Sequence, residues 1–243
     1  MMEIDAKGIY YRDLNQKIRE AVAGGEKEIL LHNVNGQRYI GAGIRGKLNI
    51  TVEGVPGNDL AAFMDGPTII VKANAQDGVS NTMNDGKVVI HGNAGDVLGY
   101  GMRGGKLFVR GNVGYRVGIH MKAYREKSPL IITGGVAGGF LGEYMAGGII
   151  ILLGLNVKNP IVGNYVGTGM HGGVIYIRGK VEEHQLGKDV IPSEPTDDDV
   201  KFLKGHLKEY CEHFNLDLEA VLDENFTKLL PLSQRPYETL YAY

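Results

Sequence analysis

The chain has 243 residues, of which 43% are apolar, so it is long enough to bury a sizeable core. Its 28 acidic and 26 basic side chains leave a formal net charge of -2, which disfavours binding to nucleic acid or to an anionic membrane. The single cysteine, Cys211, excludes an internal disulfide framework and a thiolate-rich metal site built from this chain alone. We therefore expect an untargeted, cytoplasmic protein, because the sequence shows neither a secretory signal nor a spanning segment.

The first 35 residues predict a helix-and-strand cap. A helix over residues 11–25 is indicated by apolar residues that share one helical face before two glycines: Leu14, Ile18, Ala21 and Val22. The run "EILLHNV", from Glu28, predicts a strand that enters the next segment. Stacked repeats expose apolar ends, so the simplest role for this helix is to cover one, with docking of a partner as the alternative.

Residues 36–181 hold most of the 37 glycines and contain an internal repeat. Methionines mark one repeat position at intervals of 19, 19, 19, 24 and 25 residues, and Ile44 takes that position upstream. Five and seven places after five of these methionines, all but Met121, apolar residues alternate as in a strand and are expected to point inward. One such unit cannot bury its apolar side alone, so we predict an all-β, right-handed parallel β-helix of about seven coils. Its internal ladder would comprise Ile44, Met64, Met83, Met102, Met121, Met145 and Met170.

Two features of the repeat are predicted to contact a partner. The first is a pair of insertions, "KAYREKSP" and "LNVKNPIV", with the candidates Tyr124, Arg125, Lys158 and Asn159. The second is an outward stripe on the strands, where the candidates are Phe108, Ile149, Ile151 and Tyr176. Either the flanks of the chain or another polypeptide would have to cover this apolar stripe.

Residues 182–243 are predicted to form a linker and a helical tail. Thr196 and Asp199 fit a capping box that opens a helix, which favours a structural role for the acidic run 197–199 over a metal site. Apolar residues from Phe202 to Phe214 supply one face of this helix, and a second short helix is indicated around Val221. The segment from Phe226, with two prolines, is expected to lie extended along a surface.

The remaining motifs do not indicate a catalytic or ligand-binding site. Three segments match G-x-G-x-x-G, but a strand follows each of them where a dinucleotide fingerprint needs a helix: Gly41/Gly43/Gly46, Gly99/Gly101/Gly104 and Gly167/Gly169/Gly172. Two histidine groups show no ligand spacing, namely the turn histidines His91, His120 and His171 and the helix residues His206, Cys211 and His213. We therefore predict no catalytic, cofactor-binding or metal-binding residue in this chain.

The repeats "GYGMRGGKLFVRGN", "GEYMAGGIIILLG" and "GTGMHGGVIYIRG" resemble the C-terminal GXGXG domain of the large glutamate synthase polypeptide. The resemblance covers residues 37–181, and the tail from Phe226 is similar to the segment that follows the solenoid there. It implies a right-handed parallel β-helix and a free-standing subunit without catalysis of its own, since glutamine hydrolysis in that family needs an N-terminal cysteine. The same repeats also resemble the repeat-bearing subunit of formylmethanofuran dehydrogenase, a molybdenum or tungsten enzyme.

The leading hypothesis from the resemblance is a scaffold of a glutamate synthase-type oxidoreductase, in glutamate biosynthesis, ammonia assimilation and nitrogen metabolism. Its partners would be a glutaminase and a synthase polypeptide, with FMN and an iron–sulfur cluster on the partners and homo-oligomerisation as a further option. The alternative is the repeat-bearing subunit of a formylmethanofuran dehydrogenase-type complex. A hypothesis of another class is an independent β-helix enzyme acting on a carbohydrate or acyl group, for which Glu143, beside Tyr144, is the candidate carboxylate.

Overall fold

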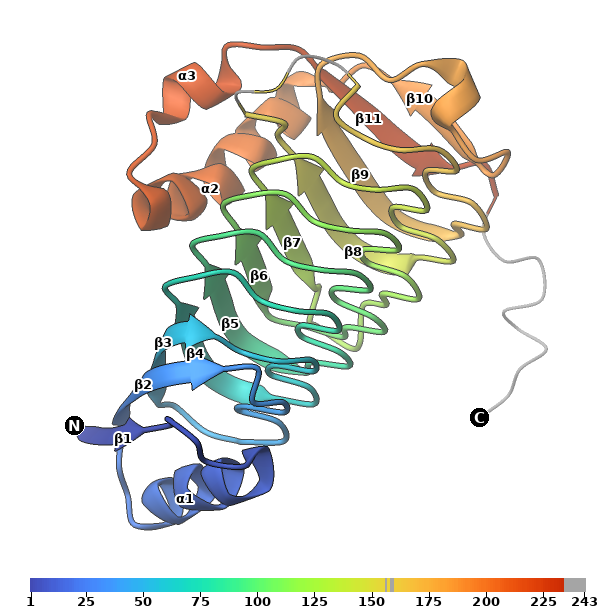
Figure 1. The fold of residues 1–243 in the computed structure, drawn as a ribbon. Helices are drawn as coiled ribbons and strands as arrows, with labels where there is room; N and C mark the ends of the chain where they lie inside the picture. Colours follow the sequence, from blue (N-terminus) through green and yellow to red (C-terminus); the bar gives the residue numbers. More distant parts are fainter. Residues whose placement is uncertain (156, 158–159, 234–243) are drawn as a thin grey trace, which may run out of the picture.

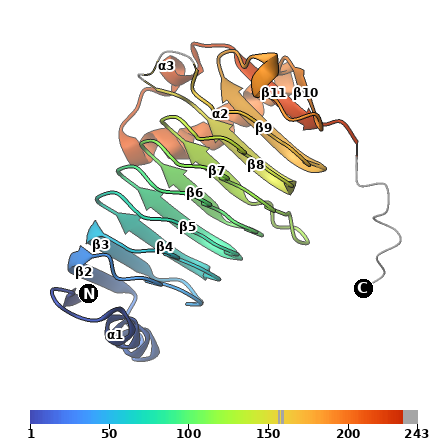
Figure 2. The ribbon, with the colours of Figure 1, turned by 45° about the vertical axis from the view of Figure 1, so that its right-hand side comes forward.

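The computed structural model describes residues 1–155, 157 and 160–233, and Figures 1 and 2 show them as a stack of coils. In this part of the chain, strands β1 to β9 pair in chain order in one sheet, and β11 and then β10 complete it. Neighbours from β1 to β9 are parallel, as a solenoid requires. The prediction of an all-β parallel solenoid with small helical flanks is therefore confirmed.

The elements and their bounds are as follows. The strands are β1 (Met2–Asp5), β2 (Glu28–Asn35), β3 (Asn49–Val55), β4 (Asp65–Val71), β5 (Asp85–Ile90), β6 (Lys106–Val109), β7 (Leu130–Thr133), β8 (Ala146–Leu152), β9 (Gly172–Arg178), β10 (Val190–Ser193) and β11 (Phe226–Pro231). The helices are α1 (Tyr11–Ala23), α2 (Asp197–Phe214), α3 (Leu218–Leu222) and the 3-10 turn η1 (Glu183–Gln185). None of the described helices has the length and apolar character needed to cross a membrane.

The interior of the stack holds the ladder residues. All seven are buried in one core cluster, together with inward residues of the strands such as Ile69 and Val71 on β4. Each coil contributes one residue to the ladder. The inward strand residues are also in register from coil to coil, since Ile69 pairs with Val88 of β5 and Val88 pairs with Leu107 of β6. Burial of these apolar side chains against the adjacent coils is the main stabilising term of a repeat fold.

A second face of the solenoid is built from turns. In residues 39–43, 59–63, 78–82, 97–101, 116–120, 140–144 and 165–169, the first, third and fifth residues all have positive φ. We name this surface the turn face. Its backbone bonds link adjacent coils, as in residues 97–101: Val97 N to Tyr115 O at 2.8 Å, Gly99 N to Val79 O at 2.8 Å and Gly101 N to Ile119 O at 2.9 Å. The G-x-G motifs therefore form a regular hydrogen-bonded surface in addition to turning the chain.

The central position of each turn segment points inward and demands a small residue. At Gly99, φ is +64°, and a Cβ atom would lie 2.5 Å from Ile131 Cδ1. Ser80 occupies the central position of residues 78–82, also with positive φ, and is fully buried. Its Oγ atom has no hydrogen-bond partner among the described residues.

We expect Ser80→Ala to stabilise the protein by about 1 kcal/mol, because it removes an unsatisfied buried hydroxyl while keeping the backbone conformation. Ala61 already occupies the equivalent position of the preceding coil with φ of 61°. Urea denaturation compares the free energies of unfolding. Thr82→Ala is the matched control, because the Thr82 hydroxyl donates to Asn81 Oδ1 and its removal should give no gain. A lower urea midpoint for Ser80→Ala than for the wild type would contradict the argument.

The outer side of the sheet is covered by α2 and α3 of the same chain (Figure 1). The outward residues Phe108, Ile149, Ile151 and Tyr176 are all buried, in a second cluster shared with Leu207 and Tyr210 of α2. The prediction that these four side chains contact a partner therefore needs correction, since the C-terminal flank of the chain covers them. The sequence left two possibilities for what covers the apolar stripe, the flanks of the same chain or another polypeptide. The structure shows that the C-terminal flank covers it.

Ion pairs and a polar network fix α2 at both ends. At its start, Thr196 and Asp199 form the predicted capping box, but Asp199 also accepts from Tyr176 Oη at 2.6 Å and pairs with Lys228 at 2.8 Å. Lys228 and Tyr176 hold the pKa of the Asp199 carboxyl well below its usual range despite partial burial, which by itself would raise it. Toward the other end, Glu209 pairs with Lys87 and Lys106 of β5 and β6.

Three histidines on the sheet side and on α2 are partly buried: His91 follows β5, and His206 and His213 belong to α2. Burial, followed by neighbouring cations, lowers the pKa of each one. The cations are Lys72 and Arg110 at His91, Lys106 at His206 and Lys87 at His213, while Glu209 offsets part of the effect at the two helix histidines. His91 also packs edge-on against the ring of Phe214, with centroids 5.3 Å apart. Each of these imidazoles therefore takes up a proton less readily in the folded chain than in the unfolded one.

The stability of the fold should fall as the pH drops below about 6.5, the pKa of an unperturbed histidine. Below that value the histidines of the unfolded chain take up protons more readily than those of the folded chain, which favours unfolding. The free energy of unfolding is therefore highest above this pH and falls as the pH drops through the lowered pKa values of the folded chain. The urea midpoint is expected to be lower at about pH 5.5 than at about pH 7.5. His206→Gln with His213→Gln should flatten this dependence, whereas His184→Gln on the exposed η1 should not. An unchanged slope in the double variant would refute the assignment.

Both ends of the stack are closed by flanking segments. At the N-terminal end α1 lies beside the first coils (Figure 1), and its Leu14 and Ile18 are fully buried in the core cluster, which favours the capping role. The sequence did not indicate β1, which pairs with β2. At the other end β11 runs antiparallel to β9, so the segment from Phe226 is extended over its described part.

Candidate functional site

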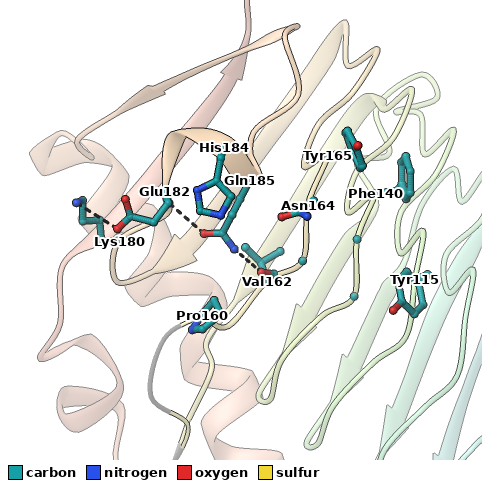
Figure 3. Close-up of a pocket in the computed structure, with 13 residues that line it drawn as sticks. Tyr115, Phe140, Pro160, Val162, Asn164, Tyr165, Lys180, Glu182, His184 and Gln185 are labelled. Atoms are coloured by element: carbon teal, nitrogen blue, oxygen red, sulfur yellow. Dashed lines mark hydrogen bonds and ion pairs between the residues drawn. The ribbon is translucent and has the colours of Figure 1, made fainter.

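A pocket of about 680 Å³ opens near the C-terminal end of the turn face (Figure 3). Three rings from successive coils line one side, and they are Tyr115, Phe140 and Tyr165. Phe140 and Tyr165 stack with centroids 4.9 Å apart and planes at 20°. The turn face places them there, because Phe140 and Tyr165 occupy its first, outward-pointing position. Pro160 and Val162 add an apolar part to the lining.

The opposite side of the pocket is the 3-10 turn η1. Gln185 holds it in place, because its buried amide donates to Val162 O at 2.5 Å and accepts from Glu182 N at 3.0 Å. The bond to Val162 joins the linker after β9 to the preceding coil, and the bond from Glu182 is part of the capping box of η1 (Figure 3). Lys180 and Glu182 pair at 3.3 Å on the rim, where both are exposed. An exposed pair of this kind contributes little stability, so both groups are free to contact a ligand or partner.

The candidate catalytic groups of the sequence lie outside the lining of this pocket. Arg116 lies over the Phe140 ring at 4.7 Å and pairs with Glu143 at 2.5 Å. Glu143, the carboxylate that a solenoid enzyme would have needed, is thus buried in an ion pair on the turn face. No group of three metal-ligating side chains comes together anywhere in the described part of the chain. Cys211 lies on the buried face of α2, and this burial raises the pKa of its thiol, which disfavours a nucleophile.

A second group of exposed rings lies on the same face. Tyr100, His120 and Tyr144 come from three successive coils, and we name them the ring stack. His120 and Tyr144 are parallel, with centroids 5.3 Å apart and planes at 10°. Tyr100 meets His120 edge-on at 5.8 Å. Tyr100 and Tyr144 remain 43% and 46% exposed, so they form a surface and not part of the core.

The insertions predicted to contact a partner have different outcomes. Tyr124 and Arg125 lie exposed at the tip of the first insertion, where the Arg125 guanidinium lies 5.1 Å from the Tyr124 ring. Lys127 of the same loop pairs with Asp85 at 2.7 Å and Asp65 at 3.5 Å, which anchors the loop on two earlier coils. Of the second insertion, Lys158 and Asn159 lie outside the described residues. Partner contact through these insertions stays a prediction.

The rings of the turn face were missed by the sequence interpretation, which treated His120 as one of several scattered turn histidines. The signal was present, because Phe63, His120 and Tyr144 each immediately precede a ladder residue. Since the ladder residue points inward, its neighbour in such an alternating segment points outward. What the sequence did not reveal is that left-handed backbone brings these outward positions into register across coils.

Comparisons with known proteins agree with this architecture. A family model described as the GXGXG motif matches residues 19–232. An uncharacterized protein of Methanocaldococcus jannaschii is 50% identical over 249 residues, which cover 98% of this chain and 95% of the relative. Among solved structures, one chain of the formyltransferase/hydrolase complex from Methylorubrum extorquens, in complex with methylofuran, has a TM-score of 0.63. It is 20% identical, and the match covers 93% of this chain and 89% of that chain, which establishes a shared fold.

Proposed function

This chain belongs to the GXGXG motif family, and from that premise we propose that it is a non-catalytic structural subunit of a multi-subunit enzyme complex. The observation that carries the proposal is the fold match to one chain of such a complex, which extends over most of both chains. Two further observations support it. Exposed aromatic side chains gather on the turn face, as at protein interfaces, and the candidate carboxylate Glu143 is buried in an ion pair.

The complex we propose first is of the formylmethanofuran dehydrogenase type. The structural neighbour belongs to a formyltransferase/hydrolase complex and was solved with methylofuran, which supports chemistry on a formyl group carried by a furan cofactor. The resemblance of the repeats to the repeat-bearing subunit of formylmethanofuran dehydrogenase points the same way. In this assignment the metal and the furan cofactor are bound by partner polypeptides, and this chain contributes rigid surfaces that hold those partners in position.

A glutamate synthase-type complex is the second candidate. It is favoured by the resemblance of the repeats to the synthase GXGXG domain and by the similar segment that follows them, which here forms β11 against β9. The partners would then be a glutaminase and an FMN-binding synthase polypeptide with an iron–sulfur cluster. The chain itself would bind none of these groups, and both assignments imply a cytoplasmic location.

Purification of the tagged chain from its native host at mild salt tests the proposal. Molybdenum or tungsten with a pterin, together with oxidation of formylmethanofuran, would establish the first assignment. Flavin and iron on co-purifying polypeptides, with glutamine-dependent glutamate formation, would establish the second. A colourless chain recovered without stoichiometric partners would overturn the structural-subunit proposal and favour an independent binding or catalytic solenoid.

A further inference from the structure

The ring stack is an exposed array with a defined orientation. His120 and Tyr144 stack in parallel and Tyr100 meets His120 edge-on, so the array presents both ring edges and a ring face across three successive coils. Ring edges carry partial positive charge and favour oxygen atoms of a partner. Tyr100 and Tyr144 also bring hydroxyl groups, and His120 brings ring nitrogens. A contiguous surface of this kind on a chain with a large buried core elsewhere indicates an interaction site.

Cations lie beside the ring stack and have no carboxylate partner among the described residues. Arg103 follows one coil's ladder methionine and Lys122 follows the next, at equivalent positions on adjacent coils. Their backbones are in register, since Arg103 N donates to Met83 O and Lys122 N donates to Met102 O. Both side chains are exposed, as is Arg125 in the insertion that begins at Lys122. Two like charges at equivalent positions of adjacent coils repel each other, and an acidic partner would reduce this repulsion.

Three carboxylates near this surface, Asp65, Asp85 and Glu143, are already in ion pairs, and the exposed Glu126 next to Arg125 offsets only one of the three cations. Lys127 pairs with Asp65 and Asp85, the acidic residues near the same edge of the two earlier coils. Arg116 pairs with Glu143, which precedes Tyr144 in the chain. This local excess of positive charge contrasts with the formal net charge of -2 of the whole chain. This surface therefore presents hydrogen-bond donors and aromatic rings to which the oxygen atoms of a partner could bind.

We propose that the ring stack, with Arg103, Lys122 and Arg125, docks an acidic segment of a partner subunit along the axis of the solenoid. This inference rests on the proposed function, because it identifies the surface through which the structural subunit holds a partner. Carboxylates of that segment would pair with the three cations, and its carbonyl or carboxylate oxygens would meet the ring edges and hydroxyl groups. A nucleic acid is disfavoured by the overall charge, and a second copy of this chain is an outcome of the test.

The test uses the tagged chain purified with its partners from the native host. Arg103→Glu with Lys122→Glu should reduce the recovery of one partner subunit by about tenfold, because like charges would then face each other across the interface. Lys17→Glu with Lys208→Glu is the matched control, since it changes charge equally at exposed residues of α1 and α2. Melting temperatures of both double variants should stay near that of the wild type, because all four side chains are exposed.

Photo-crosslinking identifies the occupant directly. A benzophenone amino acid in place of Tyr144 should crosslink to a glutamate- or aspartate-rich segment of the partner, and the same group at Lys208 should not. Equal partner recovery from both double variants, or a Tyr144 crosslink to a second copy of this chain or to nucleic acid, would overturn the docking proposal while leaving the structural role intact. Failure of the wild-type chain to recover any partner would overturn both.

Discussion

Met102→Asp should prevent the solenoid from folding, because Met102 is fully buried in the middle of the internal ladder. Coils on either side enclose it, so the new carboxylate would have neither solvent nor a cation to pair with. An uncompensated buried charge costs several kcal/mol, a large fraction of the net stability of a typical domain. The expected result is insoluble protein, or a soluble chain without a cooperative melting transition in circular dichroism.

Met102→Leu is the control for this experiment. It keeps an apolar side chain of similar volume and should cost less than about 1.5 kcal/mol. A Met102→Asp variant that melted like the wild type would show that the ladder is not a closed interior, and the stacking model would have to be abandoned.

Tyr210→Ala should detach the helical cover from the sheet. Tyr210 is fully buried on α2 and contacts the rings of Phe108 and Phe214, at centroid distances of 5.7 and 4.8 Å. Removal of a buried aromatic ring of this size costs about 3–5 kcal/mol. We expect a lower urea midpoint and increased binding of an apolar fluorescent dye, because Phe108 and its neighbours on the sheet become accessible.

Tyr210→Phe separates the ring from its hydroxyl group. The hydroxyl donates to Val109 O at 3.0 Å, but Gly134 N donates to the same carbonyl at 2.8 Å. The carbonyl therefore keeps one bond in the variant, and the expected loss is about 1 kcal/mol or less. Equal destabilisation by Tyr210→Phe and Tyr210→Ala would mean that ring packing does not hold α2 in place.

The stack could be predicted well from the sequence because its signal is local and repeated. Methionine spacing sets the coil length, and alternation around residues such as Ile69 and Val71 identifies the inward side of each strand. The capping box at Thr196 was equally visible, since it depends on residues three apart. Contacts between residues far apart in the sequence could not be predicted in this way. The bonds from Tyr176 and Lys228 to Asp199, for example, join segments whose proximity depends on the whole fold.

The candidate site was less predictable for a related reason. Outward stripes are evident in the strands, but the sequence contains no rule for whether an apolar stripe is covered by the same chain. Phe108 and Tyr144 illustrate the difference, since both are outward aromatic residues and only Phe108 is covered. The cover depends on the path of α2, which the linker and the pairing of β11 with β9 determine.

The anchoring of α2 sets a limit on the size of the solenoid. Its 18 residues give a length of about 27 Å, and it is tied to β9 through Asp199 and to β5 through the Glu209–Lys87 ion pair. Insertion or removal of one coil between these strands would displace one anchor by about 4.8 Å. The length of α2 therefore fixes the number of coils between its two anchors. A change in the number of coils would require a matching change in the length of the helix.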